Sequence, residues 1–177
     1  MKMCFLPHKK FMDRTFLSTN LIFAAIFILL LLLDRLTKKW AALVLMKGDK
    51  ELIPDILTFH YLENRGAAWG ILQNAFWLFF VITIVVVGVM IYFYARIPFV
   101  RRYWYLRFTI ILLTAGAIGN FIDRACWHYV VDFIYIEAIN FPVFNVADCY
   151  VCIAAVLLMH SILFYYKDEE LLWQRKK

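Results

Sequence analysis

Four long apolar runs dominate the chain, and nearly all of its charged residues lie outside them, at the chain ends and in the segments between the runs. The runs cover about residues 17–33, 75–95, 104–122 and 149–166. Each is near the roughly 20 residues that an α-helix needs to cross about 30 Å of hydrocarbon. Because lipid cannot hydrogen-bond to an open backbone, such a segment is expected to be helical. The pattern therefore predicts an all-α membrane protein with four transmembrane helices.

The segment between the first two runs has a different pattern. Residues 57–63, LTFHYLE, alternate apolar and polar side chains, which is typical of a β-strand. Turn-forming residues surround this stretch, and a glycine-containing turn follows it. We therefore expect a small β-containing segment that rests on the membrane surface beside the helices.

The first apolar run also resembles a signal peptide, because it follows the basic stretch HKKFMDR. No small-residue cleavage site follows it, and DRLTKKWAALVL continues at helical periodicity. We therefore expect a retained transmembrane helix.

Composition agrees with a membrane protein of one domain. The 177 residues are 64% hydrophobic with a mean hydropathy of +0.72, whereas soluble domains are about 45–50% apolar. The net charge of +6 would fit a nucleic-acid partner, but most of the basic residues lie at the chain ends and in one loop. We interpret this charge as a signal of membrane topology and expect no nucleic-acid binding.

The distribution of basic residues predicts the orientation. Segments 1–20, 96–107 and 167–177 each hold four Lys or Arg, whereas the segments 34–74 and 123–148 hold nine of the 13 acids. By the positive-inside rule, both termini are cytoplasmic and the two acidic segments face outward. We expect three parts: a cytoplasmic N-terminal segment 1–16, a four-helix domain 17–166 and a cytoplasmic tail 167–177.

Several familiar catalytic groups are absent or poorly placed. The only serines, Ser18 and Ser161, lie toward the predicted cytoplasmic side, so a serine nucleophile at the outer face is hard to build. No histidine pair has metal-ligand spacing, and His128 is a lesser functional candidate. Cys149 and Cys152 have CxxC spacing, but inside an apolar run we expect them to be packing residues. We expect neither a metal nor a cofactor.

Polar side chains remain at the outer ends of two helices. Asp34 and Lys38 are four residues apart, so a helix places them on one face, where they could form an interfacial ion pair with Lys38 reaching the headgroups. Asn120 and Arg124 have the same spacing and would offer hydrogen-bond donors to a carbonyl-rich ligand.

Two carboxylates suggest a reaction. Asp132 lies between apolar residues in VVDFI, where desolvation would raise its pKa. Asp148 precedes the fourth run, where a helix N-terminus would also favour an acid for structural reasons. Both lie at the same predicted interface, and neighbouring carboxylates in a low dielectric share a proton. One would activate water and the other protonate a scissile carbonyl, which is aspartic-protease chemistry.

Two other classes stay open from the residues alone. Intramembrane acids, asparagines and an arginine could line the ion path of a small transporter or channel subunit. They could equally hold helices together in a structural assembly partner. Transport predicts polar groups at mid-span depth, whereas here they cluster at the outer helix ends.

Five ordered motifs resemble a known family, bacterial lipoprotein signal peptidase or signal peptidase II. They are DRLTK at 34–38, NRGAAWG at 64–70, GAIGNFIDR at 116–124, VVDF at 130–133 and FNVAD at 144–148. The resemblance runs from about residue 30 to 165 and keeps the same order relative to four spans.

The resemblance implies a four-helix intramembrane aspartic endopeptidase that cuts prolipoproteins just before a diacylglyceryl-modified cysteine. Its catalytic residues would be Asp132 and Asp148. The enzyme would be a monomer in the bacterial inner membrane, in contact with lipid, with its active site at the outer face. Residues that contact substrate or shape the site would be Asp34, Lys38, Asn64, Gly66, Ala67, Asn120, Arg124 and Asn145.

Asp123 in GNFIDR is a rival for the first catalytic acid, and we rank it lower because Arg124 would hold it ionised. Two positions depart from the family pattern. Arg65 replaces a small hydroxyl residue and could bind lipid headgroups, and Ala115 stands where a glycine is common and would tighten a close helix approach.

Overall fold

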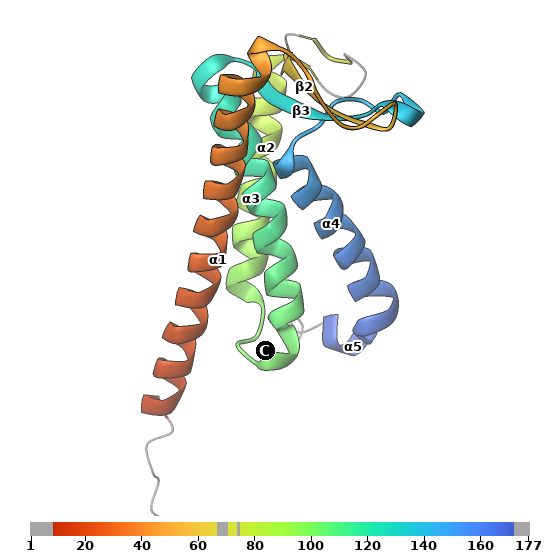
Figure 1. The fold of residues 1–177 in the computed structure, drawn as a ribbon. Coiled ribbons are helices and arrows are strands. Elements are labelled where there is room, and N and C mark those ends of the chain that lie inside the picture. Colours follow the sequence, from red (N-terminus) through yellow and green to blue (C-terminus); the bar gives the residue numbers. More distant parts are fainter. Residues whose placement is uncertain (1–8, 67–70, 74, 172–177) are drawn as a thin grey trace, which may run out of the picture.

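The computed structural model describes residues 9–66, 71–73 and 75–171. Four of the helices in this part are long and apolar enough to cross a membrane, which confirms the predicted fold class. A short helix α5 follows them (Figure 1). The helices are α1 (Lys9–Val44), α2 (Phe76–Arg96), α3 (Trp104–Trp127), α4 (Val146–His160, continued by a π-helical turn Ser161–Tyr165) and α5 (Asp168–Leu171).

A small antiparallel sheet lies across one end of the helices (Figure 1). Its strands, in the order β1-β2-β3, are β1 (Lys50–Ile53), β2 (Leu57–Asn64) and β3 (Val130–Ile136). The expected strand in LTFHYLE is confirmed as β2. β3 was not predicted; it joins the sheet from a distant part of the chain and brings Asp132 opposite Leu62.

Helix boundaries differ from the apolar runs in ways that affect the site. α1 continues to Val44, well past the end of the apolar run at 33, as the helical periodicity of DRLTKKWAALVL indicates, so Asp34 and Lys38 lie within the helix. α4 begins at Val146 with Asn145 as its N-cap, and Asp148 is the N3 partner in a capping box, which agrees with an acid favoured at this helix N-terminus.

α3 is the central helix and packs against α1, α2 and α4. Two of its glycines allow this close approach, as small residues commonly do in membrane proteins. A Cβ on Gly116 would lie 2.5 Å from the carbonyl oxygen of Ala147, and one on Gly119 would lie 2.8 Å from Oδ2 of Asp34. Ala115 is fully buried beside them, in a cluster with Tyr150 and Ala154.

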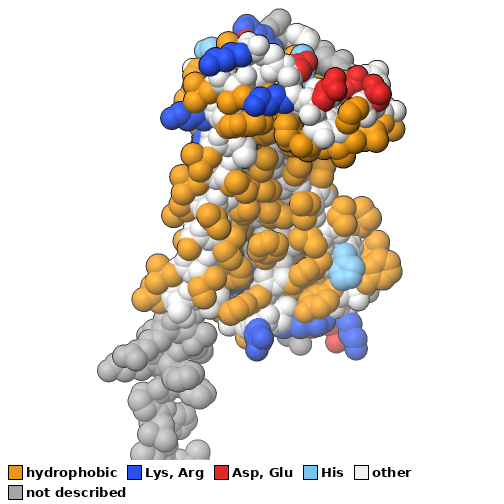
Figure 2. Space-filling model, viewed as in Figure 1, with side chains coloured by type: hydrophobic (Ala, Val, Ile, Leu, Met, Phe, Trp, Pro, Cys, Tyr) orange, Lys and Arg blue, Asp and Glu red, His pale blue; other side chains and the backbone are white. Residues whose placement is uncertain are grey.

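The distribution of side chains is that of a membrane protein. Hydrophobic side chains cover the helical part, and charged side chains lie at its two ends (Figure 2). Trp77 on α2, for example, is 73% exposed. Buried positions instead include the ionisable groups Asp34, Lys38, Asp123 and Asp132. Such groups are expensive to bury and usually mark a functional site.

Candidate active site

The two predicted catalytic aspartates come together where the sheet meets the helix ends. Asp132 lies on β3, and Asp148 lies in the first turn of α4. A bridge between Ile134 and Phe144 folds the intervening loop back onto β3. This fold-back brings Asn145, the residue that caps α4, beside Asp132.

Asn145 contacts both aspartates. Its side-chain amide Nδ2 donates to Oδ1 of Asp132 at 2.6 Å, and its backbone nitrogen donates to Oδ2 of Asp148 at 3.0 Å. In return, its Oδ1 accepts a hydrogen bond from the backbone nitrogen of Asp148 at 3.0 Å. Asn145 is fully buried, so these bonds hold the two carboxyl groups in fixed positions relative to each other.

Two further asparagines complete the hydrogen bonding of the aspartates. Nδ2 of Asn120 on α3 donates to Oδ1 of Asp148 at 2.7 Å. Nδ2 of Asn64 at the end of β2 donates to Oδ2 of Asp132 at 2.8 Å. Each of the four carboxyl oxygens therefore accepts a hydrogen bond from an asparagine.

Behind Asn120 lies a buried ionic cluster that links α1 to α3. Nζ of Lys38 lies 3.2 Å from Oδ1 of Asp34 and 2.8 Å from Oδ2 of Asp123, and it donates to Oδ1 of Asn120 at 2.8 Å. Arg35 pairs with both aspartates of this cluster. The expectation that Lys38 reaches the headgroups is wrong: its side chain is only 3% exposed, because these partners hold it inside.

Asp123, the rival catalytic candidate, belongs to this ionic cluster. Its Oδ2 also accepts a hydrogen bond from the backbone nitrogen of Val131 at 3.3 Å. The expected partner Arg124 is not the one that pairs with it, since the described ion pairs of Asp123 are with Arg35 and Lys38. The described contacts of the Asp123 carboxylate are with two side chains of α1 and with the backbone of β3, so this residue of α3 joins the three elements.

Arg124 turns toward the turn after β2. Its guanidinium donates to the carbonyl oxygen of Gly66 at 3.2 Å and lies 4.5 Å from the ring centre of Phe79 on α2. The nitrogen of Gly66 donates to Oδ1 of Asn64 at 2.9 Å, and a Cβ at Gly66 would lie 2.6 Å from the carbonyl oxygen of Ile71. Ala67, which the motif also implicates, lies outside the described residues.

The site and the ionic cluster together hold one more carboxyl group than cations. The cations are Arg35, Lys38 and Arg124, and the carboxyl groups are those of Asp34, Asp123, Asp132 and Asp148. The whole set is therefore neutral when Asp132 and Asp148 share one proton. Burial, and then the charge of Asp148, raise the pKa of Asp132 to about 7, although the hydrogen bonds from Asn64 and Asn145 oppose the shift. Asp132 is therefore suited to hold a proton near neutral pH.

A pocket of about 400 Å³ gives access to both catalytic candidates, a volume in the usual range for ligand sites. Asp34, Lys38 and Asp123 do not line it. His128 does not line it either: it ends α3 with a left-handed backbone (φ 62°) and packs on Phe76. The lining residues are Asn64, Gly66, Asn120, Arg124, Val130, Asp132, Phe141, Pro142, Val143, Phe144, Asp148, Cys149 and Cys152.

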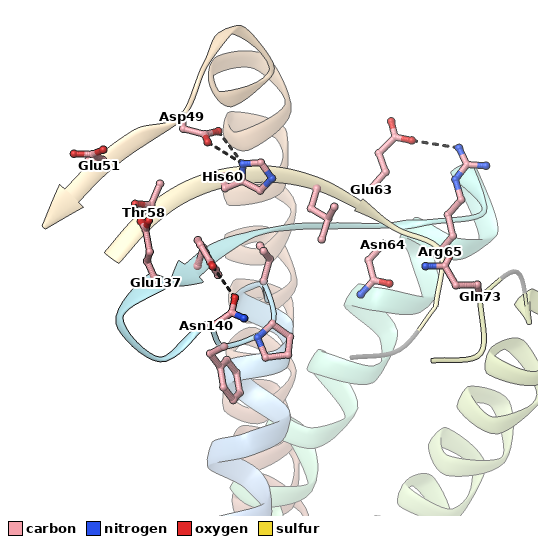
Figure 3. A pocket seen from close by; sticks show the side chains of 15 residues that line it. Asp49, Glu51, Thr58, His60, Glu63, Asn64, Arg65, Gln73, Glu137 and Asn140 are labelled. Atoms are coloured by element: carbon pink, nitrogen blue, oxygen red, sulfur yellow. Dashed lines mark hydrogen bonds and ion pairs between the residues drawn. The ribbon is translucent and has the colours of Figure 1, made fainter. Parts of the chain in front are cut away.

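A larger groove of about 880 Å³ runs along the sheet and adjoins this pocket (Figure 3). The two cavities share Asn64, Phe141, Pro142 and Val143. Charged side chains line the groove, and Figure 3 shows Glu63 paired with Arg65. This groove has no local signal in the sequence, because it depends on β3 and on the loop folded beneath it.

Comparisons with known proteins agree with this arrangement. A family model described as "Signal peptidase (SPase) II" matches residues 26–164. Lipoprotein signal peptidases from Streptococcus pyogenes serotype M5 (strain Manfredo) and serotype M18 (strain MGAS8232) are 39% identical over 150 residues. These matches cover 84% of this chain and 95% of each relative.

Two solved structures of bacterial membrane enzymes, obtained by the in meso method at 2.3 Å and 1.9 Å resolution, have the same fold. Their TM-scores are 0.70 and 0.69, with sequence identities of 32% and 35%. The alignments cover 88% and 82% of this chain, and 93% and 94% of the solved chains. Together with the family model and the curated relatives, these matches show that the chain belongs to the signal peptidase II family.

Proposed function

We propose that Asp132 and Asp148 are the catalytic pair of this peptidase, which removes signal peptides from lipoproteins. The observation that carries the proposal is the pair of hydrogen bonds from Asn145, one to each aspartate, inside a pocket at the end of the membrane helices. An enzyme of this kind cuts just before a diacylglyceryl-modified cysteine. No residue of the proposed mechanism lies outside the family match.

The reaction divides the work between the two acids. Asp132 holds the shared proton near neutral pH, because its pKa is raised to about 7, and Asp148 is the ionised partner. Asp148 takes a proton from a water molecule as that water attacks the scissile carbonyl carbon. Asp132 gives its proton to the carbonyl oxygen, which forms a neutral tetrahedral diol. When the diol collapses, the leaving amine takes a proton from Asp148, and Asp132 recovers its own.

The buried cations and amides support this division. Lys38 and the Asn145 amide both donate to Oδ1 of Asn120, at 2.8 and 3.1 Å. The amide nitrogen of Asn120 therefore points to Asp148 and stabilises its charged form. Such fixed donors need no rearrangement as charge moves during the reaction.

A second, apolar cavity supports the proposal that the signal peptide lies between the helices. It holds about 340 Å³ between α2, α3 and α4, and its α3 wall runs from Leu106 to Leu113. Leu113 is seven residues, or about two turns, before Asn120, so both lie on one face of α3. An apolar helix in this cavity would approach the aspartates from the hydrocarbon. The residues after the cysteine would leave through the polar groove along the sheet.

The distribution of basic residues supports an orientation in the membrane, and the composition of the site supports a monomer. Twelve Lys and Arg lie in the segments 1–20, 96–107 and 167–177. The positive-inside rule then supports cytoplasmic termini, an active site at the outer face of the bacterial inner membrane, and cytoplasmic segments 1–16 and 167–177. One chain supplies both acids and their donors, which supports a monomer in contact with lipid.

The function is tested with purified enzyme in detergent and a diacylglyceryl-modified prolipoprotein. We expect a gel shift, and mass spectrometry of the product should find the modified cysteine as its first residue. The matched control is the same prolipoprotein without the diacylglyceryl group, which should be cut at least about tenfold more slowly. Failure to cut the modified substrate, or a cut at another bond, would refute the proposed function.

A further inference from the structure

Two cysteines line the proposed catalytic pocket although the proposed chemistry uses neither. Cys149 and Cys152 are three residues apart on α4, so their side chains share a face of the helix. Cys149 is half-buried and Cys152 is exposed, and both are free thiols. The expectation that they are packing residues inside an apolar run does not account for their place in the pocket wall.

Their position makes them reachable from the sheet side of the protein. Cys152 follows Asp148 by four residues, which places both one turn apart near the beginning of α4. The pocket adjoins the larger groove through Asn64 and the loop 141–143. A small molecule in that groove therefore lies beside the pocket that the thiols line.

We propose that Cys149 and Cys152 form a covalent-modification site for small lipophilic Michael acceptors, such as enones and quinones. The remaining wall of the pocket includes Val130, Val143 and Phe144, which favours an apolar reagent. An adduct on either sulfur takes up part of the roughly 400 Å³ pocket that also holds both aspartates, and so competes with the substrate backbone for that space. Modification therefore blocks cleavage, a consequence that rests on the proposed function.

The chemistry needs nothing beyond the thiol and the acceptor. The sulfur forms a bond to the β-carbon of the activated double bond, whose π electrons move to the α-carbon. The α-carbon takes up the proton that the thiol gives up. No group leaves and no oxidant is required, and the reaction is faster as more thiolate is present.

The chain contains its own controls. Cys126 is exposed but does not line the pocket, and Cys4 lies outside the described residues. A Cys4→Ser/Cys126→Ser chain therefore carries only the pocket pair. The reciprocal Cys149→Ser/Cys152→Ser chain lacks that pair, and each chain is compared with its own untreated sample.

The test treats both chains in detergent with N-ethylmaleimide, maps the adducts by mass spectrometry and then measures prolipoprotein cleavage. In the chain that keeps the pocket pair, we expect an adduct on Cys149 or Cys152 and at least a tenfold loss of cleavage. The chain that lacks the pair should keep its cleavage rate within twofold. Substrate added before the reagent should slow formation of the pocket adducts.

Three results would overturn the proposal. These are no adduct on either pocket cysteine, adducts without loss of cleavage, and equal loss in the chain that lacks the pair. A wild type that never cleaves prolipoprotein would refute the proposed function instead. The adduct map would still decide whether the pocket thiols are the site of modification.

Discussion

The side-chain amide of Asn145 donates a hydrogen bond to Oδ1 of Asp132 at 2.6 Å. The same residue also caps α4 and binds Asp148 through its backbone nitrogen. Its capping role and its contact with Asp132 use different atoms, Oδ1 for the cap and Nδ2 for the contact. The two roles can therefore be separated by substitution.

Asn145→Ser should keep the cap and lose the contact. Serine is a good N-cap, because its hydroxyl oxygen accepts from the backbone, but it is too short to replace Nδ2 beside Asp132. We expect thermal stability near that of the wild type and a loss of kcat of about 10²-fold, the size of an acid–base contribution. Asn145→Ala should lose the same activity and a further ~1 kcal/mol of stability. Wild-type kcat in the serine variant would contradict the proposed role of the amide.

Lys38 should be needed for stability as long as its carboxylate partners are charged. Lys38→Met leaves Asp34 and Asp123 with Arg35 as their remaining partner in the ionic cluster. Breaking a buried ion pair in this way costs about 3–5 kcal/mol. In Lys38→Met/Asp123→Asn, one positive and one negative charge are removed together, so the loss of stability should be smaller than in the single variant. Thermal unfolding in detergent measures both, and a double variant less stable than Lys38→Met would argue against this ionic coupling.

Cleavage should decline in alkaline solution. Burial, and then the charge of Asp148, raises the pKa of Asp132 to about 7, and the proposed mechanism needs this group protonated. We expect kcat/KM to fall as the pH rises through about 7, approaching a tenfold loss per pH unit above it. A rate that stays flat up to pH 9 would show that Asp132 does not supply the proton.

The same pKa also predicts how stability depends on pH. Between the ordinary value of 3.8 and about 7, the folded state keeps a proton on Asp132 that the unfolded state has released. The contribution of this group to the free energy of unfolding is therefore largest below about pH 3.8, and it is lost as the pH rises through about 7. Asp132→Asn should remove this dependence, which thermal unfolding at pH 5 and pH 8 would reveal as a smaller difference in Tm.

Gly119 should tolerate no side chain. An added Cβ would lie 2.8 Å from Oδ2 of Asp34 and 3.2 Å from the Cβ of Ala147, so α1 and α4 would have to move. We expect Gly119→Ala to cost about 1–3 kcal/mol, as overpacking does. Gly88→Ala on α2 is the matched control, because nothing lies within 4 Å of its added Cβ. Equal stability of the two variants would contradict the packing described here.

Local patterns in the sequence were sufficient for the helices, for the strand in LTFHYLE and for the pairing of Asp34 with Lys38. Contacts between distant segments were not. Lys38 was misplaced at the headgroups because its partner Asp123 comes from α3. Similarly, β3 is a short apolar run whose pairing with β2 has no local signal beyond its β-branched residues.

The residue that begins α4 also could not be identified from the sequence. Asn145 and Asp148 both suit a helix N-terminus, and the apolar run alone does not show which of them begins the helix. The structure uses both, in a capping box that binds them to each other. This arrangement leaves one oxygen of Asp148 for Asn120 and frees the amide of Asn145 for Asp132.

The most direct test compares prolipoprotein cleavage by the wild type with Asp132→Asn, Asp148→Asn and Asp123→Asn, each checked for folding by thermal unfolding. The first two should be folded and at least about 10²-fold slower. Asp123→Asn should be less stable, because it removes a partner of Arg35 and Lys38, but its folded fraction should still cleave. If folded Asp132→Asn and Asp148→Asn enzymes both kept cutting, the catalytic pair proposed here would be wrong.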